Sequence, residues 1–268
     1  MRERLMITPG EPARLQNRDA RDGLGLEDKS EGKELLEELV EEMAVLQNRL
    51  WAESQRSVLL VLQGLDASGK DGTIRSVFSG INPQGCKVVS FKAPSALERS
   101  HDYLWRVHRA CPARGQIGIF NRSHYEDAVT VRVRGLAPEK VWRRRAQHIN
   151  DFERRLTDEG TTIIKVYLHL SRDGQRERLQ ERVDNPEKRW KFREGDLDDR
   201  ALWDDYMAAF EETLTETSTD WAPWHVVPTD RNWVRNVAVA SLIVETLRDL
   251  DPKVPDPAEN IAGTVAPE

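Results

Sequence analysis

Short runs of consecutive hydrophobic residues alternate along the chain with longer segments in which hydrophobic residues recur at helical spacing. The runs predict buried strands, because a strand covered on both faces has no polar side to present to water. We expect strands at 57–63, 87–91, 116–120, 161–170 and 224–228. The longest run, 57–62, has the length of a strand and falls well short of the roughly 18–20 residues that a membrane helix needs.

Residues 30–52 carry hydrophobic residues at helical spacing, which is typical of a helix with one buried face. We expect helices at 30–52, 73–81, 95–110, 138–160, 172–183, 200–218 and 232–249. Ser30 is a candidate N-cap, and Gly160 is a candidate C-cap. Residues 1–30 and 250–268 are mostly polar with scattered proline, and we predict a flexible arm and a flexible tail around one domain, 31–249.

Strands that alternate with helices predict an α/β fold, in which helices cover both faces of a parallel sheet. Ligands bind such sheets at the carboxyl ends of the strands. The chemistry is therefore expected in the loops that follow residues 63, 91, 120, 170 and 228.

The composition narrows the class of protein. At 38% hydrophobic and 32% charged residues, the chain is neither disordered nor collagen-like. Its two cysteines, Cys86 and Cys111, are too few for a disulfide framework. They fit a reducing cytoplasm, and the N-terminal residues show no signal peptide.

Charge is unevenly distributed along the chain. The net charge is −6, yet residues 99–193 hold 22 basic and 13 acidic residues, a local net charge of +9. Of the 40 basic residues, 30 are arginine, whose planar guanidinium binds phosphate through two hydrogen bonds. This pattern indicates an anionic ligand, although amphipathic helices with solvated arginine faces would give the same count.

The loop after the first predicted strand has the pattern of a phosphate-binding loop. Residues 64–71 read GLDASGKD, and they place the G-x-x-x-x-G-K spacing between a strand and a helix. The glycines let the backbone wrap a phosphate, Lys70 supplies positive charge, and the helix N-terminus adds its dipole. A glycine-rich turn with a surface lysine is the alternative. The candidate phosphate-binding residues here are Gly64, Ala67, Ser68, Gly69, Asp71, Gly72 and Thr73.

Two carboxylates distinguish this loop from the usual pattern. Asp71 stands where serine or threonine normally binds the metal ion. Asp66 would repel a bound phosphate unless a cation lay between them, so it is a natural Mg²⁺ ligand. Asp66 could also orient a phosphoryl acceptor.

The third strand leads into IGIFNRSHYED (117–127), where phosphate-loop proteins place a second metal-binding carboxylate. This strand ends in Asn121 instead, and Arg122 would face the phosphoryl group in transit. Glu126 and Asp127 follow one turn later. They could bind a metal or a nucleotide base, or they could simply stabilise a helix N-terminus.

Basic side chains follow two other strands. Lys92 and Ser95, after the second strand, could hold the phosphate of the acceptor or belong to an ordinary loop. The arginine-rich segment 171–196, interrupted by Pro186, is similar to a kinase lid that closes over phosphates, with a solvated charged helix as the alternative. Its candidate phosphate-binding residues are Arg178, Arg182, Lys188 and Lys191.

Four strings resemble the polyphosphate kinase 2 family: GLDASGKDG, NPQGCKVVSFKAPS, IGIFNRSHYEDAVTVRV and NPEKRWKFREGDLDDRALWDDY. The resemblance runs from about residue 55 to 248. It implies a P-loop kinase-like, three-layer α/β fold with a five-stranded parallel sheet and a helical lid at about 172–205. It also implies a phosphotransferase that moves phosphoryl groups from inorganic polyphosphate to nucleotides with Mg²⁺, or with Mn²⁺ as the alternative. Members are often oligomeric, so a homodimer or homotetramer is expected.

The same resemblance places Asp66, Lys70 and Arg122 on catalytic positions, with Arg182 and the basic residues of KRWKF where the lid meets phosphate. Many members have DRSWYNR where this chain has NRSHYED, and Asn121 and Glu126 look like the branch that accepts monophosphates as well as diphosphates. An amide binds Mg²⁺ more weakly than a carboxylate does, so Asn121 would be a weaker metal ligand than Asp66. The candidate nucleotide-binding residues are Lys92, Ser95, Asn121, Glu126, Asp127 and Arg132.

Two other functions share parts of this pattern. An ATP-dependent nucleoside monophosphate kinase would have the same loop, sheet and lid, but the basic excess over 99–193 favours a polymeric donor. A non-catalytic sensor of nucleotide or polyphosphate is supported only by Asn121, and Lys70, Asp66 and Arg122 oppose it. No basic strand interleaved with aromatic residues indicates nucleic-acid binding, and no membrane partner is expected.

Overall fold

The computed structural model describes residues 1–257 and contains the predicted parallel sheet. Its strands lie in the order β2-β3-β1-β4-β5, and each neighbouring pair is parallel. Each predicted strand differs from the observed one by at most one residue at either end. The strands are β1 Ser57–Gln63, β2 Cys86–Ser90, β3 Ile117–Asn121, β4 Thr161–His169 and β5 Trp224–Pro228.

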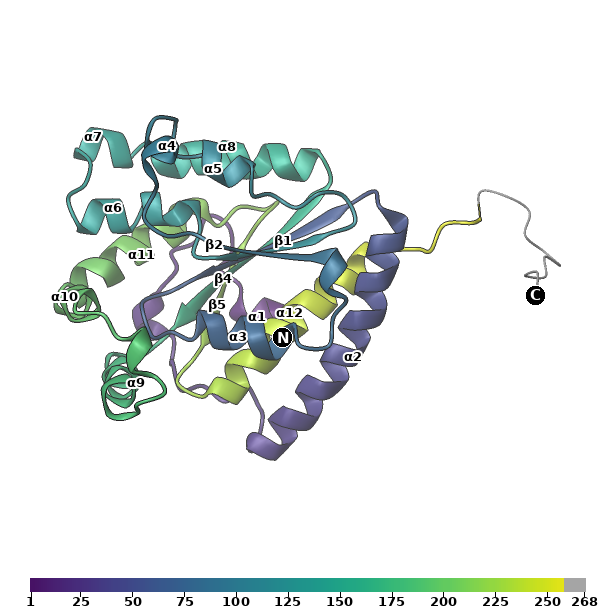
Figure 1. Cartoon of the computed structure of the whole chain (residues 1–268), viewed down its shortest axis with the longest axis horizontal. Helices are drawn as coiled ribbons and strands as arrows, with labels where there is room; N and C mark the ends of the chain where they lie inside the picture. The colour runs from purple at the N-terminus through teal and green to yellow at the C-terminus, as the bar shows by residue number, and fades with distance from the viewer. Residues whose placement is uncertain (258–268) are drawn as a thin grey trace.

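Helices cover both faces of the sheet, so the three-layer prediction is confirmed (Figure 1). One layer contains α1 Arg2–Leu5, α2 Lys29–Glu53, α3 Lys70–Val77 and α12 Asn232–Leu250. The opposite layer contains α4 Ala96–Arg99, α5 Trp105–His108, α6 Thr130–Val133, α7 Glu139–Trp142, α8 Arg145–Asp158 and α11 Trp203–Thr217. The remaining helices are α9 Arg172–Asp184 and α10 Gly195–Ala201, with short 3₁₀ turns η1 Leu15–Asn17, η2 Pro83–Gly85, η3 His124–Asp127 and η4 Arg189–Lys191.

Strand β1 forms the centre of the hydrophobic core, and all seven of its residues are buried. Leu59 and Val61 belong to the cluster beneath α8 and α11, whereas Leu60 and Leu62 belong to the cluster beneath α2 and α12. Because alternate side chains of a strand point to opposite faces, a continuous hydrophobic run serves both layers.

Three of the predicted helices are divided in the structure, and one has a different N-cap. The segment 95–110 forms two short helices instead of one, and between them the Asp102 carboxylate accepts from the Leu104 N–H at 3.0 Å. The predicted helices 138–160 and 200–218 are likewise divided, into α7 with α8 and α10 with α11. Asp28, rather than Ser30, caps α2, because its carboxylate accepts from the N–H groups of Ser30 and Glu31.

The first 30 residues are packed against the domain, which differs from the predicted flexible arm. The Ile7 N–H donates to the Trp224 carbonyl at 2.8 Å, and Met6 forms an antiparallel bridge with His225. The edge strand β5 thus provides hydrogen-bond partners for the backbone of the arm. The sequence of the arm by itself does not indicate this pairing. In the predicted tail, residues 251–257 form no helix or strand, and 258–268 lie outside the described residues.

A buried ion pair connects the sheet to the segment that follows β3. Lys165 Nζ, on β4, lies 2.6 Å from Glu153 Oε2, on α8, and also donates to the Tyr125 hydroxyl at 3.0 Å. His124 Nε2 lies 3.1 Å from Glu153 Oε1. Burial would raise the pKa of Glu153, but Lys165 and His124 outweigh it, so the pKa is lowered and the group stays ionised. The network therefore fixes η3, which carries Glu126.

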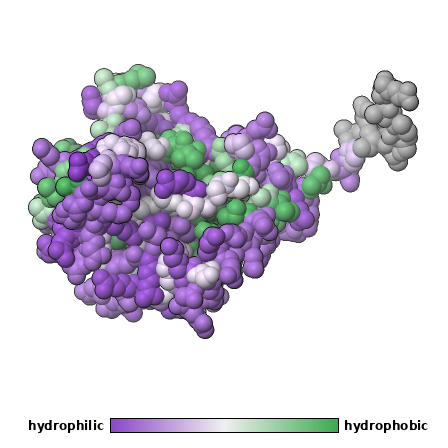
Figure 2. Space-filling model, turned by 60° about the horizontal axis from the view of Figure 1, so that its bottom comes forward, coloured by the Kyte–Doolittle hydropathy of each residue, from purple (hydrophilic) through white to green (hydrophobic). Residues whose placement is uncertain are grey.

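The surface is mainly polar. Figure 2 shows one face on which hydrophilic residues predominate and hydrophobic residues form small groups. Among residues 1–257, no helix is both long enough and apolar enough to cross a membrane.

We predict that Glu153→Gln destabilises the protein by about 3 kcal/mol, because Lys165 would then be a buried cation without its carboxylate. Urea unfolding monitored by circular dichroism measures the free energy of unfolding. Asp151→Asn, the same chemical change at an exposed position of α8, is the control and should change it by less than about 0.5 kcal/mol. Equal effects of the two variants would contradict a stabilising role for the buried pair.

Candidate active site

The loop between β1 and α3 closes around the ammonium group of Lys70. Lys70 Nζ donates to the Gly64 carbonyl at 2.6 Å and the Leu65 carbonyl at 3.1 Å, and lies 3.4 Å from Ser68 Oγ. Gly64 has a φ of +147°, and a Cβ there would lie 2.8 Å from the Leu168 carbonyl oxygen. The loop can therefore form only with glycine at this position.

Lys70 is a buried cation whose proton is held weakly. Its side chain lies beneath the loop, and the residue is 8% exposed. Burial, followed by repulsion from Arg122, lowers the pKa of Lys70 to about 8, although Asp66 and other carboxylates oppose the shift. An anion bound in the loop would stabilise the protonated form of Lys70 and raise this pKa.

Arg122 brings the loops after β1 and β3 together. Its guanidinium pairs with the Asp66 carboxylate, and Nη1 lies 3.2 Å from Glu126 Oε2. Burial would raise the pKa of Asp66, but Arg122 and then Lys70 outweigh it, so the pKa is lowered. The three predicted catalytic residues, Asp66, Lys70 and Arg122, thus form one electrostatically coupled cluster.

Arg122 has an unusual backbone conformation at the end of β3. Its φ is +62°, in the left-handed region that non-glycine residues seldom occupy. The Arg122 N–H nevertheless donates to the Leu62 carbonyl at 3.0 Å, so pairing with β1 holds the residue in place. The side chain is aimed at Asp66 as a result.

The candidate metal ligands lie on both loops. Asn121 Nδ2 donates to Asp71 Oδ1 at 2.5 Å, so the two positions that depart from the usual phosphate-loop pattern contact each other. No group of three or more His, Cys, Asp or Glu side chains within 1–257 forms a metal-binding cluster. Mg²⁺ commonly binds through one or two carboxylates together with substrate phosphates, and Asp66 and Asp71 fit that mode.

Comparison with known proteins assigns the family. Residues 26–255 match the family model described as Polyphosphate kinase 2. The chain belongs to the polyphosphate kinase 2 family. It is therefore a phosphotransferase of the kinase class, and its sheet, phosphate loop and helical layers are those of a P-loop kinase-like fold.

Three relatives cover most of the chain. An AMP/ADP-polyphosphate phosphotransferase of Meiothermus ruber is 58% identical over 212 residues, 79% of each chain. An ADP-polyphosphate phosphotransferase of Rhodopseudomonas palustris is 47% identical over 242 residues, 86% of this chain and 84% of that one. The crystal structure of polyphosphate kinase 2 from Arthrobacter aurescens is 42% identical, with a TM-score of 0.93 over 97% of this chain and 93% of that one.

The segment predicted as the lid of this kinase contains α9, η4, α10 and the start of α11. Arg182 Nη1 lies 3.0 Å from Asp196 Oδ2, which ties α9 to α10. Arg182 is also among the cations that lower the pKa of Asp66, after Arg122 and Lys70, so it lies near the phosphate loop. Lys188 pairs with Glu181, and Lys191 Nζ lies 5.1 Å from the centre of the exposed Trp190 ring.

Arg178 lies behind the phosphate loop and donates to its backbone. One guanidinium nitrogen contacts the carbonyls of Ala67 at 2.9 Å and Ser68 at 3.2 Å. The other contacts the Thr229 carbonyl and Asn232 Oδ1, the latter at 3.0 Å. Arg178 thereby connects the loop to the segment after β5, and its predicted contact with phosphate stays a prediction.

Several candidate nucleotide-binding residues already have protein partners. Ser95 caps α4 in a reciprocal pairing with Glu98, and the backbone carbonyl of Lys92 accepts from Arg106.

The candidates after β3 are paired as well. The Asp127 carboxylate lies 3.4 Å from Arg145 Nη1. Burial raises the pKa of Asp127 although Arg145 opposes the shift. Arg132 pairs with Glu212. Their predicted roles toward nucleotide remain predictions.

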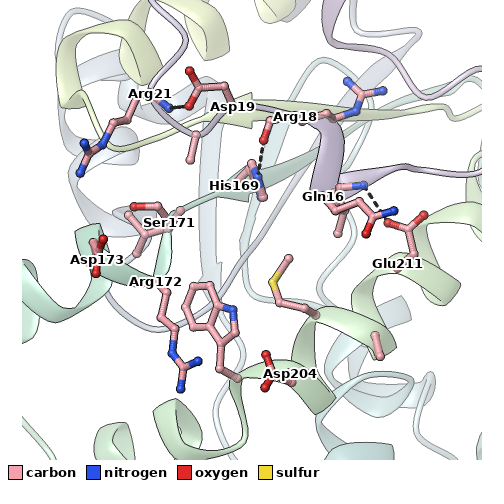
Figure 3. Close-up of a pocket in the computed structure, with 16 residues that line it drawn as sticks. Gln16, Arg18, Asp19, Arg21, His169, Ser171, Arg172, Asp173, Asp204 and Glu211 are labelled. Atoms are coloured by element: carbon pink, nitrogen blue, oxygen red, sulfur yellow. Dashed lines mark hydrogen bonds between the residues drawn. The ribbon is translucent and has the colours of Figure 1, made fainter.

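The packed N-terminal segment also lines one side of an open cavity of about 800 Å³ near the carboxyl end of β4 (Figure 3). The Arg18 carbonyl lies 2.9 Å from His169 Nε2 there, and the Leu15 N–H donates to Glu211. None of the candidate site residues lines this cavity.

Two residues that the sequence analysis did not name also contact the phosphate loop. Gln175, on α9, donates from Nε2 to the Asp66 carbonyl at 3.2 Å. Arg235, on α12, lies behind Gly69 and donates to Asn232 Oδ1, which also accepts from Arg178. Gln175 lies among the arginines of the predicted lid and Arg235 lies on a hydrophobic helix, and neither belongs to a spacing typical of phosphate binding.

We predict that phosphate binding weakens as the pH rises through about 8, because Lys70 in the empty loop then loses its proton. The folded-state pKa lies below the ordinary value of 10.5, so the unliganded protein should also gain stability between these two pH values. Calorimetric titration with tripolyphosphate from about pH 7 to about pH 9.5 measures the affinity.

Lys70→Met is the control for this titration, because it retains only the pH dependence that comes from tripolyphosphate and the other groups. The wild-type affinity should fall more steeply than that of the variant. Parallel pH profiles would show that the charge of Lys70 does not govern binding.

Proposed function

We propose that this chain transfers the terminal phosphoryl group of inorganic polyphosphate to nucleoside mono- and diphosphates, reversibly and with Mg²⁺. AMP and ADP are the first acceptors to consider, and GMP and GDP the next. The observation that carries the proposal is the coupled cluster of Lys70, Asp66 and Arg122 at the end of β1, next to an arginine-rich lid. The relatives named AMP/ADP- and ADP-polyphosphate phosphotransferase support the choice of donor and acceptors.

The geometry suits transfer through a loose transition state, in which catalysis consists of positioning and charge stabilisation. Lys70 would exchange the carbonyls of Gly64 and Leu65 for phosphoryl oxygens of the donor. Arg122 would turn from Asp66 and Glu126 toward the group in transit, where its charge opposes the developing negative charge. Asp66, released from Arg122, would orient the acceptor or hold a cation.

Kinases of this family are generally metal-dependent. In our proposal the cation is Mg²⁺, with Mn²⁺ as the alternative, and Asp66 holds it together with Asp71 or the weaker ligand Asn121. The cation would supply charge neutralisation between the phosphates of donor and acceptor. The carboxylates near the phosphate loop fit this task, since a hard cation prefers oxygen ligands.

The lid offers a way to bind polyphosphate, a donor that has no base or sugar for the protein to recognise. Arg182 is among the cations that lower the pKa of Asp66, and Lys188 and Lys191 are further cations of the lid, of which Lys188 pairs with Glu181. A long polyanion could contact all of them at once, whereas ATP would also require a base pocket on the donor side. This arrangement favours polyphosphate over ATP as the donor.

The proposal also covers the oligomeric state, the partners and the cellular location of the enzyme. We expect a homodimer or homotetramer, and no nucleic acid or membrane as partner. A cytoplasmic location is consistent with Cys86 and Cys111, which are both free thiols. Burial raises the pKa of each thiol to about 11, so both stay reduced and unreactive near neutral pH.

One assay separates this proposal from the two alternatives. Purified protein is incubated with Mg²⁺ and AMP or ADP, with either polyphosphate or ATP as donor, and the products are separated by anion exchange. New ADP or ATP from polyphosphate supports the proposal. Transfer to AMP from ATP alone would identify a nucleoside monophosphate kinase, and binding without transfer would identify a sensor.

We predict that Lys70→Met and Asp66→Asn each lower kcat by about 10²–10³-fold, because each removes a charge that acts on the phosphoryl group. Initial rates with saturating polyphosphate and ADP measure the effect. Lys33→Met, an exposed lysine of α2, is the matched control and should retain full activity. If either variant folds with an unchanged circular dichroism spectrum and keeps more than about a tenth of the rate, its catalytic role is rejected.

We also predict that Glu126→Asn depresses the use of AMP more than the use of ADP. Glu126 holds Arg122 at 3.2 Å and accepts from Thr130 Oγ1 at 2.8 Å, so it sets where Arg122 can meet the shorter acceptor. The ratio of kcat/KM for AMP to that for ADP measures this, and we expect it to fall about tenfold. Glu139→Asn, an exposed carboxylate of α7 that pairs with Arg143, is the control. An unchanged ratio would leave Glu126 with only a local structural role.

A further inference from the structure

Arg235 is a buried cation directly behind the phosphate loop, and nothing in the sequence motifs assigns it a role. The residue lies near the start of α12 and is 3% exposed. A Cβ at Gly69 would lie 1.9 Å from Arg235 Nη1, and one at Gly72 would lie 3.3 Å from Nη2. The guanidinium therefore packs against the backbone where the loop becomes helix α3. Gly69 is required for this contact as well as for its φ of +101°.

No carboxylate within 1–257 accepts a hydrogen bond from Arg235. Its acceptors are neutral amides: Nη1 donates to Asn232 Oδ1 at 2.8 Å, and Nη2 donates to Asn236 Oδ1 at 2.9 Å. Asn232 Oδ1 also accepts from Arg178 at 3.0 Å, so one amide oxygen joins two guanidinium groups. Burial, followed by repulsion from Arg178, lowers the pKa of Arg235 to about 9, and the group is still a cation at neutral pH.

This arrangement is unfavourable in the empty protein. Charged groups are almost never buried unless they are paired with the opposite charge. The N-terminus of α3 carries positive partial charge of its own, and no side chain caps it. Two guanidinium groups and a helix dipole of the same sign thus converge behind the loop that Lys70 also enters. Such a concentration of positive charge favours an anion on the other side of the loop.

We propose that Arg235 is a positioning residue that strengthens polyphosphate binding by its charge, acting through the backbone of Gly69 and Gly72 and without touching the phosphate. The low polarity of its surroundings lets a single charge act over several ångströms. Because the guanidinium is fixed by amide hydrogen bonds and by packing, it does not have to reorient when the anion binds. The inference relies on the proposed function only for the identity of the anion.

According to this proposal, the charge of Arg235 lowers the stability of the protein without ligand and raises its affinity for polyphosphate. A purely structural arginine would stabilise the protein and leave the affinity unchanged. Arg235→Met keeps the bulk and removes the charge, so the unliganded protein should be as stable as the wild type or more stable. The Kd for tripolyphosphate, the probe ligand, should rise about tenfold. Arg235→Lys, which restores the charge, should recover most of the affinity. Arg248→Met makes the same change at an exposed position of the same helix and should alter neither quantity.

Thermal unfolding of the full chain, with and without tripolyphosphate and Mg²⁺, gives both quantities without any phosphoryl transfer. The expected result is an unchanged or raised Tm for the unliganded Met variant and a smaller shift with tripolyphosphate. A lowered Tm with an unchanged shift would overturn the proposal and make Arg235 structural. If Arg235→Met does not fold, Arg235→Gln takes its place, since it keeps an amide donor toward Asn232 and Asn236 without the charge.

Two further outcomes separate this inference from the proposed function. If tripolyphosphate stabilises wild type and the uncharged variant equally, the role of Arg235 fails and polyphosphate binding stands. If tripolyphosphate does not stabilise the wild type at all, both the inference and the choice of polyphosphate as ligand are overturned.

Discussion

The ion pair between Asp66 and Arg122 connects two loops that are 56 residues apart in the sequence. It can form because β1 and β3 are direct neighbours in the sheet, with Leu62 paired to Asn121 in parallel register. A slip of that register would move Arg122 away from the phosphate loop. The buried pair of Lys165 and Glu153 supports the same placement from below, because it holds the segment of η3 next to the sheet.

The electrostatics around this ion pair are unbalanced when no anion is bound. Lys70, Arg178 and Arg235 lie within or directly behind one short loop, and burial lowers the pKa of each of them. Asp66 attracts Lys70 and so offsets part of this charge, whereas within residues 1–257 the side-chain acceptors of Arg235 are amides. A protein that keeps unpaired positive charge at the place where it binds anions gives up stability for affinity. Arg182 of the lid is a further cation that acts on Asp66, and cations near the loop suit a donor that consists only of phosphates.

The arrangement of carboxylates differs from the usual phosphate-loop pattern. Asp71 replaces the usual hydroxyl residue and contacts Asn121, which replaces the usual carboxylate. The end of β3 has an amide where a carboxylate is usual, and the start of α3 has a carboxylate where a hydroxyl is usual. Because the two side chains contact each other, a negative charge is kept near the same place. Glu126 adds a second carboxylate to Arg122, and the position of that guanidinium depends on both Glu126 and Asp66.

The sequence by itself determined the strands, their alternation with helices and the phosphate loop, because these depend on local patterns: a hydrophobic run, a glycine spacing, a lysine that opens a helix. It also placed Asp66, Lys70 and Arg122 together, since the carboxyl ends of parallel strands share one edge. Only the tertiary structure decided that Met6 and Ile7 pair with β5 and that Arg235 lies behind Gly69. Those features arise from contacts between segments distant in the chain. Arg235 lies on a hydrophobic helix, and its local sequence does not indicate that it packs against Gly69, 166 positions earlier.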